Sequence, residues 1–258
     1  MSGTNLGAQM LAALRLQMEF GADEAILDTS VDRFAAPEAA AARPPAAPAQ
    51  APAPSEEPAG AAALAARART LGELAEAMRG WEGSDLRLGA RNFVFADGRA
   101  GARLMIVGEA PGSEEDRQGK PFVGRAGQLL DRMLAAIGLS RHAEDPDRAA
   151  YIANILPWRP PGNRTPSERE VAAFLPFVER HIVLAAPQIV MTVGNTPTRA
   201  LLGTATGIKR MRGTWHRHAA SGAALIPSFH PAYLLRQPSE KRLSWRDLRA
   251  VRAKLDGC

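Results

Sequence analysis

Residues 104–112, LMIVGEAPG, join a short apolar run to a turn of glycine and proline, and this junction decides the fold. An apolar run of this length, bounded by turn residues, is typical of a strand buried on both faces of a parallel sheet. Three more such runs occur, at residues 151–156, 188–193 and 224–227. Segments with apolar residues at every third or fourth position separate the first three runs, which indicates helices between parallel strands. We therefore predict an α/β fold with three layers (α/β/α) around a central, mostly parallel four-stranded sheet.

Composition divides the chain into three parts. Residues 1–34 hold a possible N-terminal helix or tail, because apolar residues recur near helical spacing within residues 1–20. Residues 35–69 are rich in Ala and Pro, a composition that cannot bury enough apolar area to fold, and we predict a linker there. Residues 70–258 have a globular composition and begin with a predicted helix over 70–80, which Thr70 would cap.

Several classes of protein are excluded by composition. No apolar run of about 18 residues exists, which excludes a membrane-spanning helix. The single cysteine, Cys258, excludes a disulfide framework or a cysteine-rich metal site within the chain. The net charge of +5 favours an anionic partner, with nucleic acid first. Residues 209–212 (KRMR) and 241–254 could contact phosphates, although the second segment also carries an apolar stripe that predicts packing.

Polar side chains follow three of the predicted strands, at the point where each strand ends. Glu109 lies in the turn after the first strand, Asn154 ends the second, and His230 follows the fourth. The carboxyl ends of parallel strands meet at one edge of a sheet, where open α/β sheets bind their ligands. Neither a P-loop nor a dinucleotide fingerprint is present, which argues against a nucleotide-dependent enzyme. Each residue alone has an ordinary structural explanation, but together they predict a site.

Three longer motifs point to a family. GEAPGSEEDRQGKPFVGRAGQLLD at residues 108–131, N-x-x-x-W-RPPGNRTP at 154–166 and HPAYLLR at 230–236 resemble, in this order, the motifs of family 4 uracil-DNA glycosylases. The resemblance implies a monofunctional DNA N-glycosylase of bacterial base-excision repair. Such an enzyme hydrolyses the N-glycosidic bond of flipped-out deoxyuridine in single- or double-stranded DNA and leaves an abasic site. We expect a cytoplasmic, nucleoid-associated monomer that does not contact membranes.

A second hypothesis on the same fold is a non-catalytic module. Such a module would bind abasic DNA or accompany a polymerase.

The chemistry of uracil release assigns roles to the strand-end residues. The side-chain amide of Asn154 can donate to O4 of uracil and accept from N3–H, which cytosine does not offer. His230 can donate toward O2 as negative charge develops on the base, and Glu109 can stabilise the positive sugar and orient water. The alternatives to Glu109 are three acids of the following segment, Glu114, Glu115 and Asp116.

The other predicted site residues surround the extruded base and its DNA. The resemblance assigns base stacking to Phe122, although this ring could instead anchor its loop in the core. Gly108 and Ala110 would present backbone amides to the base, and Ala110 replaces a water-positioning Asp of the best-known glycosylase family. The residues predicted to grip DNA or fill the vacated stack are Arg125, Arg164, Tyr233, Leu235 and Arg236.

The sequence differs from the family at the residues that would bind a cofactor. Family 4 enzymes usually hold an iron–sulfur cluster on four cysteines, and aligning the motifs puts these positions at Trp81, Ser84, Trp158 and Phe174. Because none of the four is cysteine, we predict no cofactor and no metal. Three of them are large aromatic residues, and we expect Trp81, Trp158 and Phe174 to pack together where the cluster would be.

Overall fold

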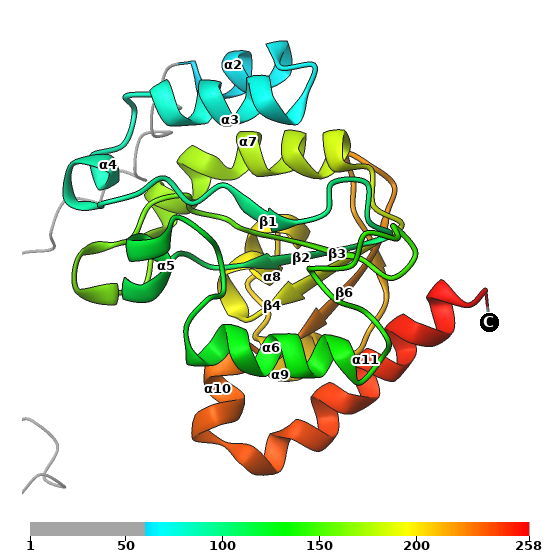
Figure 1. Cartoon of the computed structure of the whole chain (residues 1–258). Helices are drawn as coiled ribbons and strands as arrows, with labels where there is room; N and C mark the ends of the chain where they lie inside the picture. Colours follow the sequence, from blue (N-terminus) through cyan, green and yellow to red (C-terminus); the bar gives the residue numbers. More distant parts are fainter. Residues whose placement is uncertain (1–59, 258) are drawn as a thin grey trace, which may run out of the picture. The chain divides into compact units, whose positions relative to one another are not determined.

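A six-stranded sheet runs through the centre of the computed structural model, which describes residues 60–257 (Figure 1). Its strand order is β1-β3-β2-β4-β6-β5. Strands β3, β2, β4 and β6 pair in parallel, and β1 and β5 add to the two edges in antiparallel pairs. The strands are β1 (Ala96–Gly98), β2 (Leu104–Gly108), β3 (Ala150–Asn154), β4 (Ile189–Val193), β5 (His216–Arg217) and β6 (Ala224–Ser228).

The four parallel strands confirm the strands predicted from the apolar runs, within two residues at each end. The predicted number of strands is too low, because the sheet has six strands rather than four. The two additional strands are three and two residues long. A segment this short carries no readable alternation of apolar and polar residues, so the sequence gives no signal for it.

Helices cover both faces of the sheet and complete the predicted three layers (Figure 1). Helices α2, α3 and α7 lie over one face, and α6 and α11 lie over the other. The helices are α2 (Ala61–Arg67), α3 (Leu71–Gly80), α4 (Leu86–Gly89), α5 (Ser113–Gln118), α6 (Arg125–Ala135), α7 (Glu168–Ala185), α8 (Asn195–Leu202), α9 (Ile208–Met211), α10 (Pro231–Arg236) and α11 (Lys241–Leu255). Within residues 60–257, none of them is both long and apolar enough to cross a membrane.

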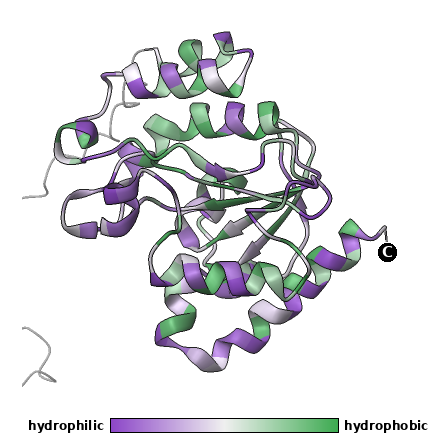
Figure 2. Cartoon of the chain, in the orientation of Figure 1, coloured by the Kyte–Doolittle hydropathy of each residue, from purple (hydrophilic) through white to green (hydrophobic). Residues whose placement is uncertain are grey.

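The two helical layers bury alternate residues of the same strands. In β2, Met105 and Val107 belong to the apolar cluster beneath α7, whereas Leu104 and Ile106 belong to the cluster beneath α6 and α11. All four side chains are fully buried. Figure 2 shows the consequence, because the central strands are mostly hydrophobic while the helices carry polar residues as well. A strand buried on both faces explains why its sequence is a continuous apolar run.

The domain begins earlier than the sequence predicts. The possible N-terminal helix and most of the predicted linker lie outside the described residues, but the linker boundary at residue 69 is wrong. Residues 61–67 form α2, which buries Ala61 and Ala65 in the cluster beneath α7. Arg180 of α7 donates two hydrogen bonds to the carbonyl oxygen of Ala68, at 2.9 and 2.6 Å. Small side chains let this helix approach closely, so an alanine-rich segment can pack without large apolar residues.

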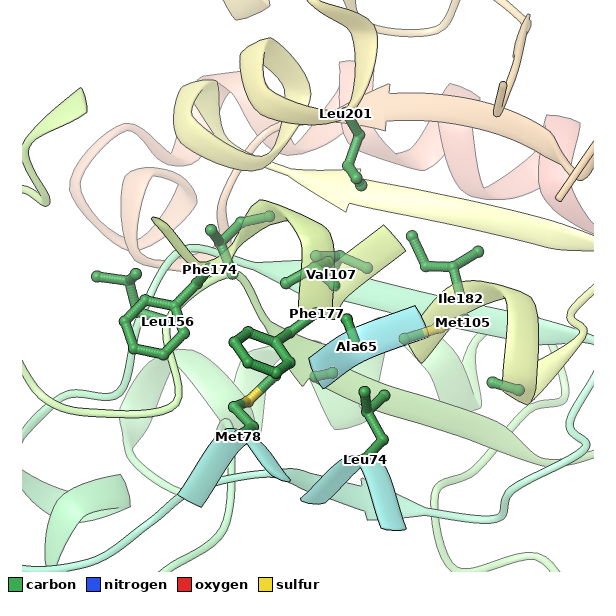
Figure 3. Close-up of a cluster of buried hydrophobic side chains, with 14 of the residues drawn as sticks. Ala65, Leu74, Met78, Met105, Val107, Leu156, Phe174, Phe177, Ile182 and Leu201 are labelled. Carbon is green, nitrogen blue, oxygen red and sulfur yellow. The ribbon is translucent and has the colours of Figure 1, made fainter. Parts of the chain in front are cut away.

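Aromatic residues occupy three of the four positions where the resemblance places the cluster ligands, and Ser84 occupies the fourth. The rings of Trp81 and Phe174 meet edge to face at 5.2 Å, and Phe177 lies 5.5 Å from Trp81. Trp158 is buried in the same apolar cluster, but its ring packs on Phe93, at 5.1 Å. Figure 3 shows Phe174 and Phe177 between the sheet and the helix that carries Met78. The predicted packing is therefore direct for Trp81 and Phe174, and Trp158 joins them through the shared cluster.

Gly83 is a test of this packing. A Cβ atom on Gly83 would lie 2.1 Å from Cζ2 of the Trp81 indole, so Gly83→Ala should displace the ring from the cluster. We expect the free energy of unfolding to fall by about 1–3 kcal/mol, the usual range for overpacking. Chemical denaturation would measure this change.

Gly80→Ala is the matched control, because a Cβ atom there would meet nothing within 4 Å. Since Gly80 ends α3, alanine should leave the stability within about 1 kcal/mol of the original or raise it. Equal stability of the two variants would contradict the packing of Trp81 over Gly83.

Candidate active site

A cleft of about 1450 Å³ opens at the carboxyl edge of the parallel strands. The pairing of the strands creates it, because Gly108 is the neighbour of Asn154 and Val193 is the neighbour of Ser228. The segments that follow these strand ends supply the walls, as the sequence predicts for an open α/β sheet. The predicted site residues that line the cleft are Glu109, Ala110, Phe122, Asn154, Arg164, His230, Tyr233 and Arg236.

Asn154 lies deep in the cleft with its hydrogen-bonding capacity unused. The residue is 6% exposed, and neither Oδ1 nor Nδ2 has a hydrogen-bond partner among the described residues. A buried polar group without a partner costs about 1–3 kcal/mol, so such a group in a cleft points to a ligand. The donor and the acceptor lie on one planar amide and would pair with a ligand that offers an acceptor beside a donor.

Gly108 and Phe122 surround this amide. A Cβ atom on Gly108 would lie 2.4 Å from Oδ1 of Asn154 and 2.6 Å from two ring atoms of Phe122. Only glycine therefore fits at residue 108. Gly108 is not among the residues that line the cleft, but it makes room for Asn154 and Phe122, which do line it. The Phe122 ring lies 5.5 Å from the His230 ring, so these two predicted site residues are brought together.

His230 presents a neutral imidazole to the cleft. It caps α10, where its Nδ1 accepts a hydrogen bond from the backbone amide of Ala232 at 3.1 Å. Burial, with a smaller contribution from Arg236, lowers the pKa of His230 to about 4, although Glu115 opposes this shift. Because Nδ1 accepts, the proton of the neutral ring lies on Nε2, which is then a hydrogen-bond donor.

Glu109 is held by a residue that the sequence analysis missed. Its Oε2 accepts a hydrogen bond from Oγ1 of Thr196, at 2.5 Å. Thr196 lies in the first turn of α8, directly after β4, and it lines the cleft. Its position directly after the third parallel strand in the chain is a signal in the sequence, because polar residues also follow the other three parallel strands. The hydroxyl fixes one carboxylate oxygen, and the other makes no hydrogen bond within residues 60–257.

The three acids considered as alternatives to Glu109 have other partners. Glu114 is paired with Arg117 on the surface of α5, and this arginine lowers the pKa of the Glu114 carboxyl. Asp116 is buried and accepts hydrogen bonds from the backbone amides of residues 91 and 92. Glu115 lines the cleft but accepts from three backbone amides, those of Gly112 (3.1 Å), Val123 (2.9 Å) and Gly124 (2.9 Å).

The residues predicted to bind DNA divide into two groups. Arg164, Tyr233 and Arg236 line the cleft, and Arg164 is held by Glu170 through two hydrogen bonds of 2.6 and 2.8 Å. Arg125 and Leu235 are not among the residues that line it. Arg125 is exposed at the start of α6, and Leu235 packs partly buried against the apolar cluster around Phe229 and Leu234.

One basic segment differs from its prediction. Lys209 and Arg210 of the KRMR segment line the cleft, but Arg212 points into the protein. Its guanidinium pairs with the buried Asp247 and lies 5.6 Å from the centre of the Phe229 ring. Arg212 is therefore committed to packing under the loop that leads to His230, and the predicted phosphate contact is wrong for this residue.

Comparison with known proteins agrees with this geometry. Residues 95–249 match the model of the uracil DNA glycosylase superfamily. The chain is also 39% identical over 160 residues to the type-4 uracil-DNA glycosylase of Thermotoga maritima, which covers 60% of this chain and 78% of that protein. The chain belongs to the type-4 uracil-DNA glycosylase family. Further family members of the same name are those of Saccharolobus solfataricus, 37% identical over 172 residues, and Sulfurisphaera tokodaii, 34% identical over 169 residues. These matches cover 64% and 62% of this chain and 77% and 74% of those proteins, respectively.

The residues present do not fit the iron–sulfur cluster that is usual in this family. Trp81, Ser84, Trp158 and Phe174 supply no thiolate, and the rings of Trp81 and Phe174 are in edge-to-face contact. Across residues 60–257, no group of three or more His, Cys, Asp or Glu side chains is arranged to hold a metal ion. These four side chains therefore offer no ligands for an iron–sulfur cluster, and the aromatic ones pack in the apolar core instead.

The protonation state of His230 can be tested directly. With a pKa of about 4, the ring should stay neutral with its proton on Nε2 across the neutral pH range. The unfolded chain would bind this proton near pH 6.5, so its contribution to stability should be complete above about pH 6.5 and lost as the pH falls toward 4. Nitrogen-15 NMR of the imidazole would report the tautomer and the midpoint. A midpoint near the ordinary histidine value would contradict the burial of the ring.

Proposed function

We propose that this chain is a uracil-DNA glycosylase that hydrolyses the N-glycosidic bond of flipped-out deoxyuridine in DNA and leaves an abasic site. The observation that carries the proposal is the buried, unpartnered amide of Asn154 in the cleft, with Phe122 and His230 beside it. Family membership supports the same reaction, since the relatives carry that name. A base inside duplex DNA cannot reach such a cleft, so the nucleotide must be extruded first.

Recognition of the base follows from the donor and acceptor of Asn154. Nδ2 would donate to O4 of uracil while Oδ1 accepts from N3–H, and both unused atoms would then be satisfied. Cytosine offers an amino group and an unprotonated N3 in these places, so it would leave the amide mismatched. Phe122 would provide the stacking surface for the extruded base.

Bond breaking places negative charge on the base and positive charge on the sugar. The neutral His230 would donate its Nε2–H toward O2 of the departing uracil, which stabilises the anion without a proton having to be transferred. Glu109, with one oxygen held by Thr196, would use the other to orient water and stabilise the sugar cation. With Ala110 in the next position, no second carboxylate is available there, so Glu109 would do this alone.

The basic residues around the cleft suit a DNA backbone. Arg164, Lys209, Arg210 and Arg236 line it and would contact phosphates independently of sequence, in single- or double-stranded DNA. Tyr233, packed against Phe229 at 5.0 Å, would occupy the space that the flipped nucleotide leaves. Lys120, the one lysine of the three matched motifs, is paired with Asp97 at 3.6 Å and is not among the residues that line the cleft, which supports a monofunctional enzyme.

The proposal also covers the oligomeric state, the location in the cell and two further contacts to DNA. We propose that the chain acts as a monomer on chromosomal DNA in the bacterial cytoplasm, with Arg125 and Leu235 as further contacts to the DNA. The support is the substrate itself, together with the exposure of Arg125 at the start of α6.

Incubation with a uracil-containing oligonucleotide, followed by alkali, tests the reaction. The original protein should yield strand cleavage at the uracil, and no cleavage before alkali. Glu109→Ala and His230→Ala should each slow excision by at least about 100-fold, the usual magnitude for a charge-stabilising group. Binding of the oligonucleotide without cleavage would instead support the non-catalytic module.

Asn154→Asp tests recognition of the base separately from bond breaking. An aspartate cannot donate to O4, so uracil excision should fall by at least about 100-fold, with any remaining activity shifted toward cytosine. Gln188→Glu is the matched control, because it makes the same change of amide to carboxylate on an exposed side chain that accepts from Arg103. Unchanged uracil excision by Asn154→Asp would refute the role of this residue.

We further propose that the protein folds and works without a cofactor. Removal of metals by chelation should leave the midpoint of thermal unfolding and the rate of uracil excision unchanged. Phe174→Ala should in contrast cost about 3–5 kcal/mol of stability, because it opens a cavity in the aromatic group that takes the place of the cluster. A fall in the unfolding midpoint on chelation, together with bound iron, would overturn the proposal.

A further inference from the structure

The backbone at Phe122 has an unusual conformation that needs support. Its φ is +54°, in the left-handed region that residues other than glycine rarely adopt. The residue is also 5% exposed, so its loop is packed into the protein. Such conformations persist where the surroundings hold the backbone on several sides. The hydrogen bonds of the neighbouring peptides show what holds Phe122 in this conformation.

Arg141 holds the peptides on both sides of this residue. Its Nη1 donates to the carbonyl oxygen of Pro121 at 2.8 Å, and its Nη2 donates to that of Phe122 at 2.9 Å. The Arg141 side chain is 2% exposed, and Asp131 (2.8 Å) and Asp97 (3.2 Å) neutralise its charge. The planar guanidinium donates to two carbonyl oxygens and two carboxylates at once, which the single ammonium group of a lysine cannot reproduce.

Glu115 holds the backbone on the C-terminal side. One of its oxygens, Oε1, accepts from the amides of Val123 and Gly124, both at 2.9 Å. The other oxygen accepts from the amide of Gly112, in the turn after β2. Arg141 therefore binds the carbonyl oxygens of the two peptides that flank the strained residue, and Glu115 binds the next two amides. The Glu115 carboxylate also ties the loop to the turn that carries Glu109.

We propose that Arg141 is a positioning residue for uracil excision, which acts by holding Phe122 in its left-handed conformation so that the ring faces the base. Arg141 does not line the cleft, so it touches neither base nor DNA there and can act only through the loop. The inference rests on the proposed function and deepens it. Holding the ring in place before the base arrives removes the need to order the loop during the reaction.

A double-mutant cycle between Arg141 and Phe122 tests this. Arg141→Lys should lower kcat/KM for uracil excision by about tenfold or more in the original protein, but by less than about twofold in a Phe122→Ala background. A residue that merely supports the fold would cause the same loss in both backgrounds, and equal losses would overturn the proposal. Should Arg141→Lys fail to fold, Asp131→Asn loosens the same guanidinium and should show the same dependence on Phe122.

Arg180→Lys is the matched control: like Arg141, Arg180 lies outside the cleft lining and donates to a backbone carbonyl, but it holds Ala68 rather than the Phe122 loop. Its effect on excision should be equal in both backgrounds.

A crystal structure of Arg141→Lys gives a readout that does not depend on activity. Phe122 should relax to a negative φ, and a retained left-handed conformation would overturn the proposal even if uracil proves not to be the substrate. Absence of uracil excision by the original protein, with relaxation of Phe122 in the variant, would refute the proposed function and leave the support of the loop by Arg141 intact.

Discussion

The close approach of two parallel strand ends governs the site. Gly108 and Asn154 are neighbours at the ends of β2 and β3, and the amide of Asn154 occupies the space that a side chain on residue 108 would need. The same space admits the edge of the Phe122 ring. A small residue at one strand end therefore lets an amide and an aromatic ring share one corner of the cleft, and the other groups are arranged around that corner.

Much of this arrangement could be read from the sequence. The four parallel strands are apolar runs because helices bury them on both sides, and their common direction places Glu109, Asn154 and His230 at one edge. The predicted cap is also confirmed, since Thr70 accepts a hydrogen bond at the start of α3. These features depend on local patterns and on one rule of topology, so neighbouring residues in the sequence suffice to predict them.

The features that could not be predicted depend on contacts between distant segments. Thr196 reaches Glu109 across 87 positions, and Arg141 reaches the Phe122 carbonyl across 19. Nothing near Arg212 in the sequence indicates that Asp247 will draw it inward. Helix α2 was missed for a related reason, because alanine gains burial only when another helix lies close enough to cover it.

On the proposal that the protein works without a cofactor, the aromatic group of Trp81, Phe174 and Phe177 changes what the protein requires from its cell. Clusters of iron and sulfur must be assembled by other proteins, and they are destroyed by oxidants. The packing of Trp81 against Phe174 and Phe177 needs only the chain itself, so it is complete as soon as the chain has folded. On that proposal, repair of DNA would not depend on the supply of iron or on protection of a cluster from oxidants.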